Sequence, residues 1–129
     1  MAMASADRYR IGQIVRAFSV TPRAVRYYEE CGLVRPARSG TDRVFSQADY
    51  ERLRFIVEAR RAGLGVIDIH ELLDLYDPKD GGRRQLERKV QLLRTQLEAL
   101  EAQRHALKAG IELSLSALAD LDRPTSKAA

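Results

Sequence analysis

The sequence predicts a mostly α-helical protein in which a small domain of short helices is followed by one long helix. Three observations predict this arrangement. Apolar residues recur at helical spacing from Ile11 onward. Helix start and stop signals divide residues 8–77 into short segments. After a break at residues 78–82, a single apolar ladder continues from Leu86 to Leu121.

The composition allows a folded domain and excludes several classes of protein. The chain has 129 residues, of which 45% are hydrophobic and none is Trp, so a mainly aliphatic core is expected. Cys31 is the single cysteine, which excludes an internal disulfide and a cysteine-rich metal site. No signal pattern and no membrane-length apolar run occurs, so we expect a cytoplasmic protein. No catalytic constellation or phosphate-binding loop is present, so we expect neither an enzyme nor a cofactor.

The first two helices are short and lie next to each other in the chain. Residues at helical spacing define the first of them: Ile11, Ile14, Val15 and Phe18. A break at Ser19-Val20 follows. Thr21 then provides an N-cap with Pro22 at the first helical position, and Gly32 ends the second helix. Two helices joined by a tight turn are typical of a helix-turn-helix, whose second helix reads DNA.

Positive charge is concentrated in this region. Residues 8–43 contain eight Arg, no Lys and three acids, a net charge of +5 against +4 for the whole chain. Arg23, Arg26 and Tyr27 share one face if the segment is helical. Guanidinium groups make bidentate contacts with phosphate and guanine. A preference for Arg over Lys throughout the protein explains the choice of residue, but it does not explain the clustering.

A basic hairpin and two more helices complete the domain. Residues 34–46 predict a two-stranded hairpin with its turn at Ser39-Gly40 and its returning strand at Val44-Phe45. Ser46 and Asp49 form a capping box for a helix that ends near Ala62, before Gly63. Its inward residues are Leu53, Ile56 and Val57. A further short helix is expected over about residues 66–75, with apolar Ile69, Leu72 and Leu73.

The long helix carries a heptad repeat from residue 83 to about residue 120. The ladder has polar rungs at Arg104 and Ser114, and its apolar rungs are Leu86, Val90, Leu93, Leu97, Leu100, Leu107, Ile111, Leu118 and Leu121. A helix of this length measures roughly 55 Å. Nothing in the N-terminal part is long enough to cover it, so we expect a homodimer. Folding back into a hairpin is the alternative, with Gly110 as the only weak candidate for a turn.

These patterns predict five parts of the chain. Residues 1–7 form a flexible N-terminus, and residues 8–77 form a winged helix-turn-helix domain. Residues 78–82 are a linker, residues 83–121 are the dimerisation helix, and residues 122–129 are a short tail.

The ordered set of motifs resembles the MerR family of bacterial transcription regulators. The segments that carry the resemblance are residues 8–14, residues 21–33 with Pro36, and Arg43-Val44-Phe45. The resemblance implies a homodimer with antiparallel long helices, a recognition helix in the major groove and a wing beside it. It also implies a pseudo-palindromic promoter operator whose over-long spacer the dimer distorts, which realigns the promoter for RNA polymerase.

The resemblance also implies individual roles. Arg23 would read base edges, and phosphates would be held by Thr21, Arg26, Tyr27 and Tyr28. Arg43 and Arg38 would serve the wing, and Arg60 would grip phosphates near the operator centre. Two alternatives stay open: one of the two tyrosines packs on the core, and Arg60 with Arg61 is an ordinary exposed helix end. Gly65 stands where the family usually has a Ser or Thr cap.

The sequence says less about the effector that would control this regulator than about its contacts with DNA. Metal-responsive members place Cys near both ends of the long helix, where this chain has none, and His70 and His105 are far apart. Residues 73–86 resemble a subgroup linked to branched-chain amino-acid and fatty-acid breakdown, which suggests an acyl-CoA effector. Effector-free repression is an alternative. The main rival to a DNA-binding regulator is a coiled-coil interaction protein whose N-terminal helices form a cap.

Overall fold

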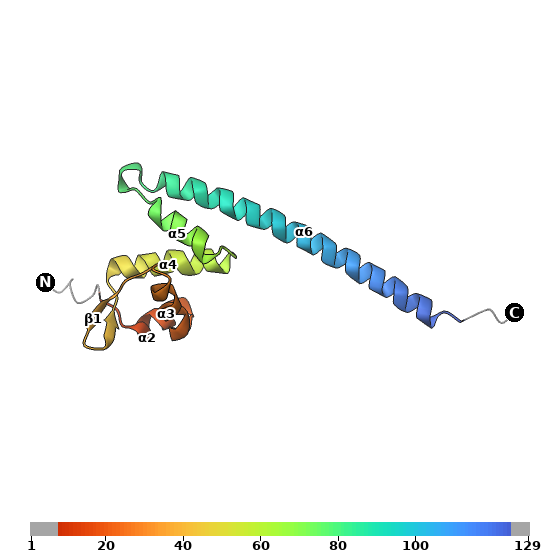
Figure 1. Cartoon of the computed structure of the whole chain (residues 1–129), viewed down its shortest axis with the longest axis horizontal. Coiled ribbons are helices and arrows are strands. Elements are labelled where there is room, and N and C mark those ends of the chain that lie inside the picture. The colour runs from red at the N-terminus through yellow and green to blue at the C-terminus, as the bar shows by residue number, and fades with distance from the viewer. Residues whose placement is uncertain (1–7, 125–129) are drawn as a thin grey trace. The chain divides into compact units, whose positions relative to one another are not determined.

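The computed structural model describes residues 8–124, which fall into two units with their boundary between Leu93 and Arg94. The first unit contains most of the elements (Figure 1). In chain order the elements are α2 (Ile11–Phe18), α3 (Pro22–Glu30), β1 (Ala37–Ser39), β2 (Asp42–Val44), α4 (Gln47–Arg61), α5 (Val66–Asp74), a 3₁₀ turn (Pro78–Asp80) and α6 (Arg83–Asp122). The mostly α-helical class is confirmed.

Local signals fix both ends of α3, as predicted. The Thr21 hydroxyl oxygen accepts a 3.0 Å hydrogen bond from the backbone N–H of Ala24, and Pro22 opens the helix. At the other end Gly32 has φ +76°, a left-handed conformation that glycine adopts without strain. The Leu33 N–H then donates to the Tyr28 carbonyl at 3.0 Å. This pairing is a Schellman motif, which satisfies carbonyls that the helix end leaves free.

The hairpin after α3 forms a small wing. Strands β1 and β2 are antiparallel, and Arg38 is the register partner of Arg43. Because Ser39 pairs with Asp42, the turn lies at Gly40-Thr41, one residue later than predicted. The returning strand ends at Val44, and Phe45 instead forms a bridge with Tyr9 through two 2.8 Å backbone hydrogen bonds. That bridge joins the start of the chain to the base of the wing.

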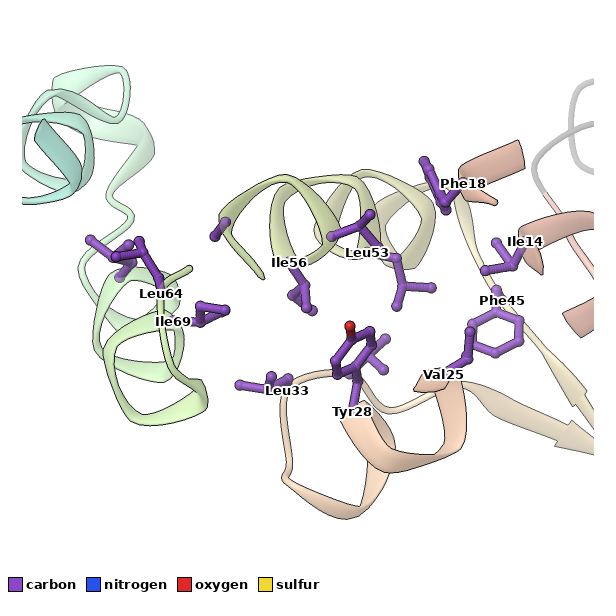
Figure 2. Close-up of a cluster of buried hydrophobic side chains, with 14 residues drawn as sticks. Ile14, Phe18, Val25, Tyr28, Leu33, Phe45, Leu53, Ile56, Leu64 and Ile69 are labelled. Atoms are coloured by element: carbon purple, nitrogen blue, oxygen red, sulfur yellow. The ribbon is translucent and has the colours of Figure 1, made fainter. Parts of the chain in front are cut away.

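Helices α4 and α5 pack against the helix-turn-helix. The capping box is confirmed: Ser46 Oγ accepts from the Asp49 N–H at 3.0 Å, and Asp49 Oδ2 accepts from the Ser46 N–H at 2.9 Å. Both helices contribute to one aliphatic core, which also contains residues from α2, from α3 and from the segments before and after the wing (Figure 2). Its fully buried large side chains are Phe45, Ile14, Leu33, Leu53, Ile56, Ile69, Leu72, Val25 and Val34.

The first turns of α6 belong to the N-terminal unit. Gln85 is buried, and its Nε2 donates a 3.0 Å hydrogen bond to the Leu72 carbonyl. Leu92 and Leu93 pack partly against the core. The boundary between the units therefore lies after Leu93, beyond the predicted start of the dimerisation helix at residue 83. Of the ladder residues at this end, Leu93 packs against the core, whereas Leu86 and Val90 are exposed.

The second unit is the rest of α6. The helix is continuous from Arg83 to Asp122 and passes through Gly110, so the chain does not turn back there as the hairpin alternative required. Among residues 8–124, no helix combines the length and the apolar character needed to cross a membrane.

Candidate nucleic-acid interface

Helix α3 has one polar face and one buried face. Arg23, Arg26 and Tyr27 are exposed, whereas Val25 and Tyr28 are buried in the core. Residues three and four apart lie side by side on a helix, so the two guanidinium groups and the Tyr27 phenol form one surface. This combination suits phosphate oxygens and base edges.

The two neighbouring tyrosines have different environments. Tyr27 is 46% exposed, whereas Tyr28 is 7% exposed and packs among the core side chains (Figure 2). The Tyr28 ring packs beneath α3, and the predicted contact of its hydroxyl with phosphate stays a prediction. The alternative that one of the two tyrosines packs on the core is the one that the structure adopts.

Tyr27 lies close to the ends of both α3 and α4. A hydrogen bond with the Cys31 side chain raises the pKa of Tyr27, and the nearby Arg60 guanidinium opposes that rise only in part. The phenol therefore keeps its proton and remains a hydrogen-bond donor at neutral pH. Arg60 is exposed near the end of α4, where its Nη1 donates to the Leu64 carbonyl at 3.3 Å. The predicted contacts Tyr27 and Arg60 thus belong to one surface.

Arg61 has a structural contact that the sequence did not indicate. Its guanidinium donates a hydrogen bond to the backbone carbonyl of Phe18, the last residue of α2. A cation at a helix C-terminus also interacts favourably with the helix dipole. The contact ties the end of α4 to the turn that precedes α3. Because the two residues are far apart in the chain, no local pattern predicts it.

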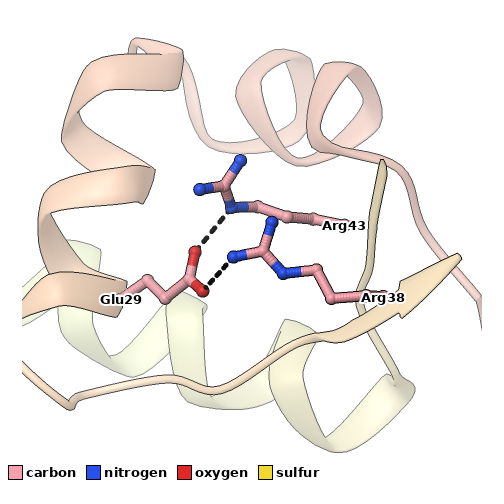
Figure 3. Close-up of polar contacts among 3 residues, drawn as sticks. All are labelled: Glu29, Arg38 and Arg43. Atoms are coloured by element: carbon pink, nitrogen blue, oxygen red, sulfur yellow. Dashed lines mark hydrogen bonds and ion pairs between the residues drawn. The ribbon is translucent and has the colours of Figure 1, made fainter. Parts of the chain in front are cut away.

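The two wing arginines both meet a carboxylate on α3 (Figure 3). Arg43 Nε lies 2.5 Å from Glu29 Oε1, and Arg38 Nη2 lies 2.8 Å from Glu29 Oε2. The hydrogen bond from Arg43 is the main cause that lowers the pKa of Glu29 below its ordinary value, and the charge of Arg38 adds to it. Burial of the carboxylate acts in the opposite direction.

This arrangement changes the interpretation of the wing. Arg38 and Arg43 were predicted as DNA contacts, but each also forms an ion pair within the protein. The Arg43 side chain is only 23% exposed, compared with 48% for Arg38. The exposed pair between Arg10 Nη1 and Asp42 Oδ2, at 2.8 Å, is a further tie to the hairpin. Glu29 was not predicted as a functional residue.

The described residues hold no obvious metal centre. No group of three or more His, Cys, Asp or Glu side chains within residues 8–124 is close enough to bind a metal ion. The His70 imidazole lies 3.2 Å from the Asp74 carboxylate one turn further along α5.

Comparisons with known proteins agree with this geometry. The sequence profile described as "MerR HTH family regulatory protein" matches residues 9–76, and the profile "MerR, DNA binding" matches residues 50–113. The chain belongs to the MerR family. It is 30% identical over 115 residues to the HTH-type transcriptional regulator HmrR of Rhizobium leguminosarum bv. viciae, covering 88% of this chain and 89% of the relative. The predicted DNA-binding transcriptional regulator is confirmed, and the relatives are regulators and not enzymes.

Solved structures support the same MerR fold. A MerR-family regulator from Bacillus cereus superposes with a TM-score of 0.68 at 18% identity, covering 95% of this chain and 87% of the other. HiNmlR, described as a family regulator lacking the sensor domain and bound to promoter DNA, superposes with a TM-score of 0.52 at 20% identity. That match covers 87% of this chain and 88% of HiNmlR. At these identities the matches establish the fold alone.

Proposed function

We propose that this MerR-family protein binds a pseudo-palindromic promoter operator as a homodimer and regulates transcription by distorting the promoter spacer. Each subunit would place α3 in the major groove, with Arg23 at base edges and Arg26, Tyr27 and Thr21 at phosphates. Arg60 extends the phosphate contacts toward the operator centre. The observation that carries the proposal is the polar face of α3, on which Arg23, Arg26 and Tyr27 are exposed.

The apolar ladder of α6 supports the homodimer. Its apolar rungs beyond the N-terminal unit are about half exposed or more in the single chain: Leu97 56%, Leu100 49%, Leu107 61%, Ile111 58%, Leu118 56% and Leu121 81%. A row of exposed aliphatic side chains on one helix is costly in water unless a second helix covers it. The same helix of a second copy, in antiparallel orientation as in the family, is the simplest cover. Leu86 and Val90 extend the seam, whereas Leu93 also packs within its own subunit.

Spacer distortion follows from two-fold binding. A rigid dimer fixes the distance between its two recognition helices, so DNA of a different geometry must bend or untwist to meet both. Bending a site of 20–30 base pairs costs about 1–6 kcal/mol, which the additional contacts can offset. In an over-long promoter spacer, such distortion would bring the two hexamers back into alignment for RNA polymerase. The protein would then act in the cytoplasm.

The signal for this regulator remains a separate proposal. The comparisons do not support the subgroup linked to branched-chain amino-acid and fatty-acid breakdown, so an acyl-CoA effector rests on residues 73–86 alone. With Cys31 as its single cysteine, the chain has no pair of thiolates for a soft metal ion. HiNmlR, of similar length and described as lacking the sensor domain, supports the alternative of an effector-free regulator.

The proposal is tested by selecting binding sites from the genomic DNA of the source cell. Fragments retained by the purified protein are sequenced, and their boundaries are mapped by footprinting. We expect an inverted repeat inside a promoter spacer. In vitro transcription with RNA polymerase then separates activation from repression. Retained fragments without an inverted repeat, or retention of all fragments alike, would contradict the proposal and favour the coiled-coil interaction protein.

A further inference from the structure

We propose that Glu29 is a positioning residue for operator recognition, which holds the wing against α3 so that both elements meet DNA in one fixed geometry. The inference rests on the proposed function and adds a residue that the DNA need not touch. Figure 3 shows the arrangement: the carboxylate at the end of α3 faces both wing arginines, and each arginine bonds to a different oxygen.

The Glu29 carboxylate accepts hydrogen bonds from both strands of the hairpin. Arg38 on β1 and Arg43 on β2 are register partners, and they donate to different oxygens of Glu29, at 2.8 and 2.5 Å. A two-oxygen acceptor between two planar guanidinium groups restrains rotation as well as distance. We call these three residues the wing clamp.

Apart from the wing clamp, few contacts fix the orientation of the wing. Each strand has only three residues, and isolated two-stranded hairpins are marginally stable. The bridge between Tyr9 and Phe45 anchors the base of the hairpin. In the ion pair between Arg10 and Asp42, each side chain is more than 60% exposed, so water and salt weaken their attraction. The wing clamp is more enclosed, since the Glu29 side chain is 21% exposed.

The charge of Glu29 is hard to explain without such a role. The carboxylate is ionised at neutral pH, and it joins two elements proposed to contact a polyanion. A carboxylate there reduces the attraction for phosphates. Placing the arginines correctly would offset that loss. The clamp uses Nε of Arg43 and one terminal nitrogen of Arg38, so neither clamp bond occupies a terminal nitrogen of Arg43.

Glu30 provides a matched control for the charge. It is the next residue on α3, it is exposed, and it forms no ion pair within the part of the chain described by the structure. Glu29→Gln and Glu30→Gln each remove one negative charge from the same turn of the helix. Only Glu29→Gln replaces the clamp carboxylate by an amide, which cannot accept charge-assisted hydrogen bonds on both atoms.

The experiment compares dissociation constants for the operator duplex recovered by genomic selection and for a shuffled duplex of equal length. For Glu30→Gln we expect both duplexes to bind more tightly by the same factor, which leaves the specificity ratio unchanged. For Glu29→Gln we expect the specificity ratio to fall about tenfold, because the wing loses its orientation while the net charge becomes more favourable. Hydroxyl-radical footprints should lose the protection beside the wing and retain it at the recognition helix.

Equal factors on both duplexes for both variants, with unchanged footprints, would overturn the positioning role and leave Glu29 as a simple charge. Unfolding of Glu29→Gln is checked by circular dichroism. In that case Glu29→Asp, which keeps the negative charge but shortens the side chain that reaches both arginines, must give the same selective footprint loss for the proposal to stand. If the wild-type protein itself fails to prefer the operator over the shuffled duplex, the proposed function fails and not only the role of Glu29.

Discussion

The Glu29 carboxylate of α3 accepts a 2.5 Å hydrogen bond from Nε of Arg43 on β2, fourteen residues further along the chain. This bond joins the recognition helix to the wing, the two elements expected to contact DNA. It also means that Arg43 contributes to the shape of the binding surface and not only to its charge. The consequences concern stability as well as recognition.

The wing clamp predicts a specific pH dependence of stability. Because Arg43 and Arg38 lower the pKa of Glu29 in the folded protein, the ionised carboxylate stabilises the fold above the unfolded-state pKa of about 4.3. That contribution is lost as the pH falls from about 5 through the lowered folded-state pKa. Urea denaturation of wild type and Glu29→Gln between pH 3 and 7 should show two curves that converge at low pH. A constant difference across this range would contradict the prediction.

Arg23 and Arg26 should have distinguishable roles. Arg23→Ala should cost about 1–3 kcal/mol on the operator and little on shuffled DNA, because a base contact is lost. Arg26→Ala should weaken binding to all sequences and reduce the salt slope by about one, because a phosphate contact is lost. Fluorescence anisotropy titrations at several salt concentrations measure both quantities. If both variants affect all sequences alike, Arg23 does not read bases.

Substitutions of Tyr27 and Tyr28 should affect different properties. Changing Tyr28 should lower the stability of the fold, whereas changing Tyr27 should lower the affinity for DNA. Tyr28→Ala removes a core aromatic ring and should reduce the free energy of unfolding by about 3 kcal/mol or more. Tyr27→Phe removes only an exposed hydroxyl, so unfolding should change by less than about 0.5 kcal/mol while DNA affinity falls. Chemical denaturation and DNA titration of the two variants check this division. A stable Tyr28→Ala protein would show that the core assignment is wrong.

Two glycines on either side of Leu64 should respond oppositely to the same substitution. Gly65 is the N-cap of α5 with φ −80°, and a Cβ there would meet no atom within 4 Å. Gly65→Ser should therefore stabilise the protein by about 0.5 kcal/mol, since serine caps the helix and restricts the unfolded chain. Gly63 has φ +92°, so Gly63→Ser should destabilise by about 1 kcal/mol or more. Thermal melts of both variants give the two signs.

Local signals in the sequence were sufficient for most of the helix-turn-helix. Thr21 with Pro22, Gly32, and Ser46 with Asp49 each act within one helical turn, so the helix ends were predictable to within about a residue. The buried face of α3 was also accessible, because Tyr28 follows Val25 by three residues whereas Tyr27 aligns with Arg23.

Contacts between distant segments were not predictable in the same way. Three contacts depend on how separate elements pack together. They are the wing clamp at Glu29, the hydrogen bond from Arg61 to the Phe18 carbonyl, and the packing of Leu93. A heptad pattern assigns Leu93 to the seam because it reports only the helix face, and it does not reveal that Leu93 already packs against the core of the N-terminal unit. Among residues 8–124, the ladder beyond Leu93 has no such partner.

The number of chains bound to one operator duplex tests directly whether the protein acts as a homodimer. Native mass spectrometry should show two chains per operator duplex for the wild-type protein. Leu97→Asp, which places a charge in the apolar ladder, should give monomers with at most one chain per duplex and weak binding. Leu113→Asp is the matched control, since Leu113 is 73% exposed and lies off the ladder, and it should remain dimeric. One wild-type chain per duplex, or a Leu97→Asp protein that still binds as a pair, would contradict the account.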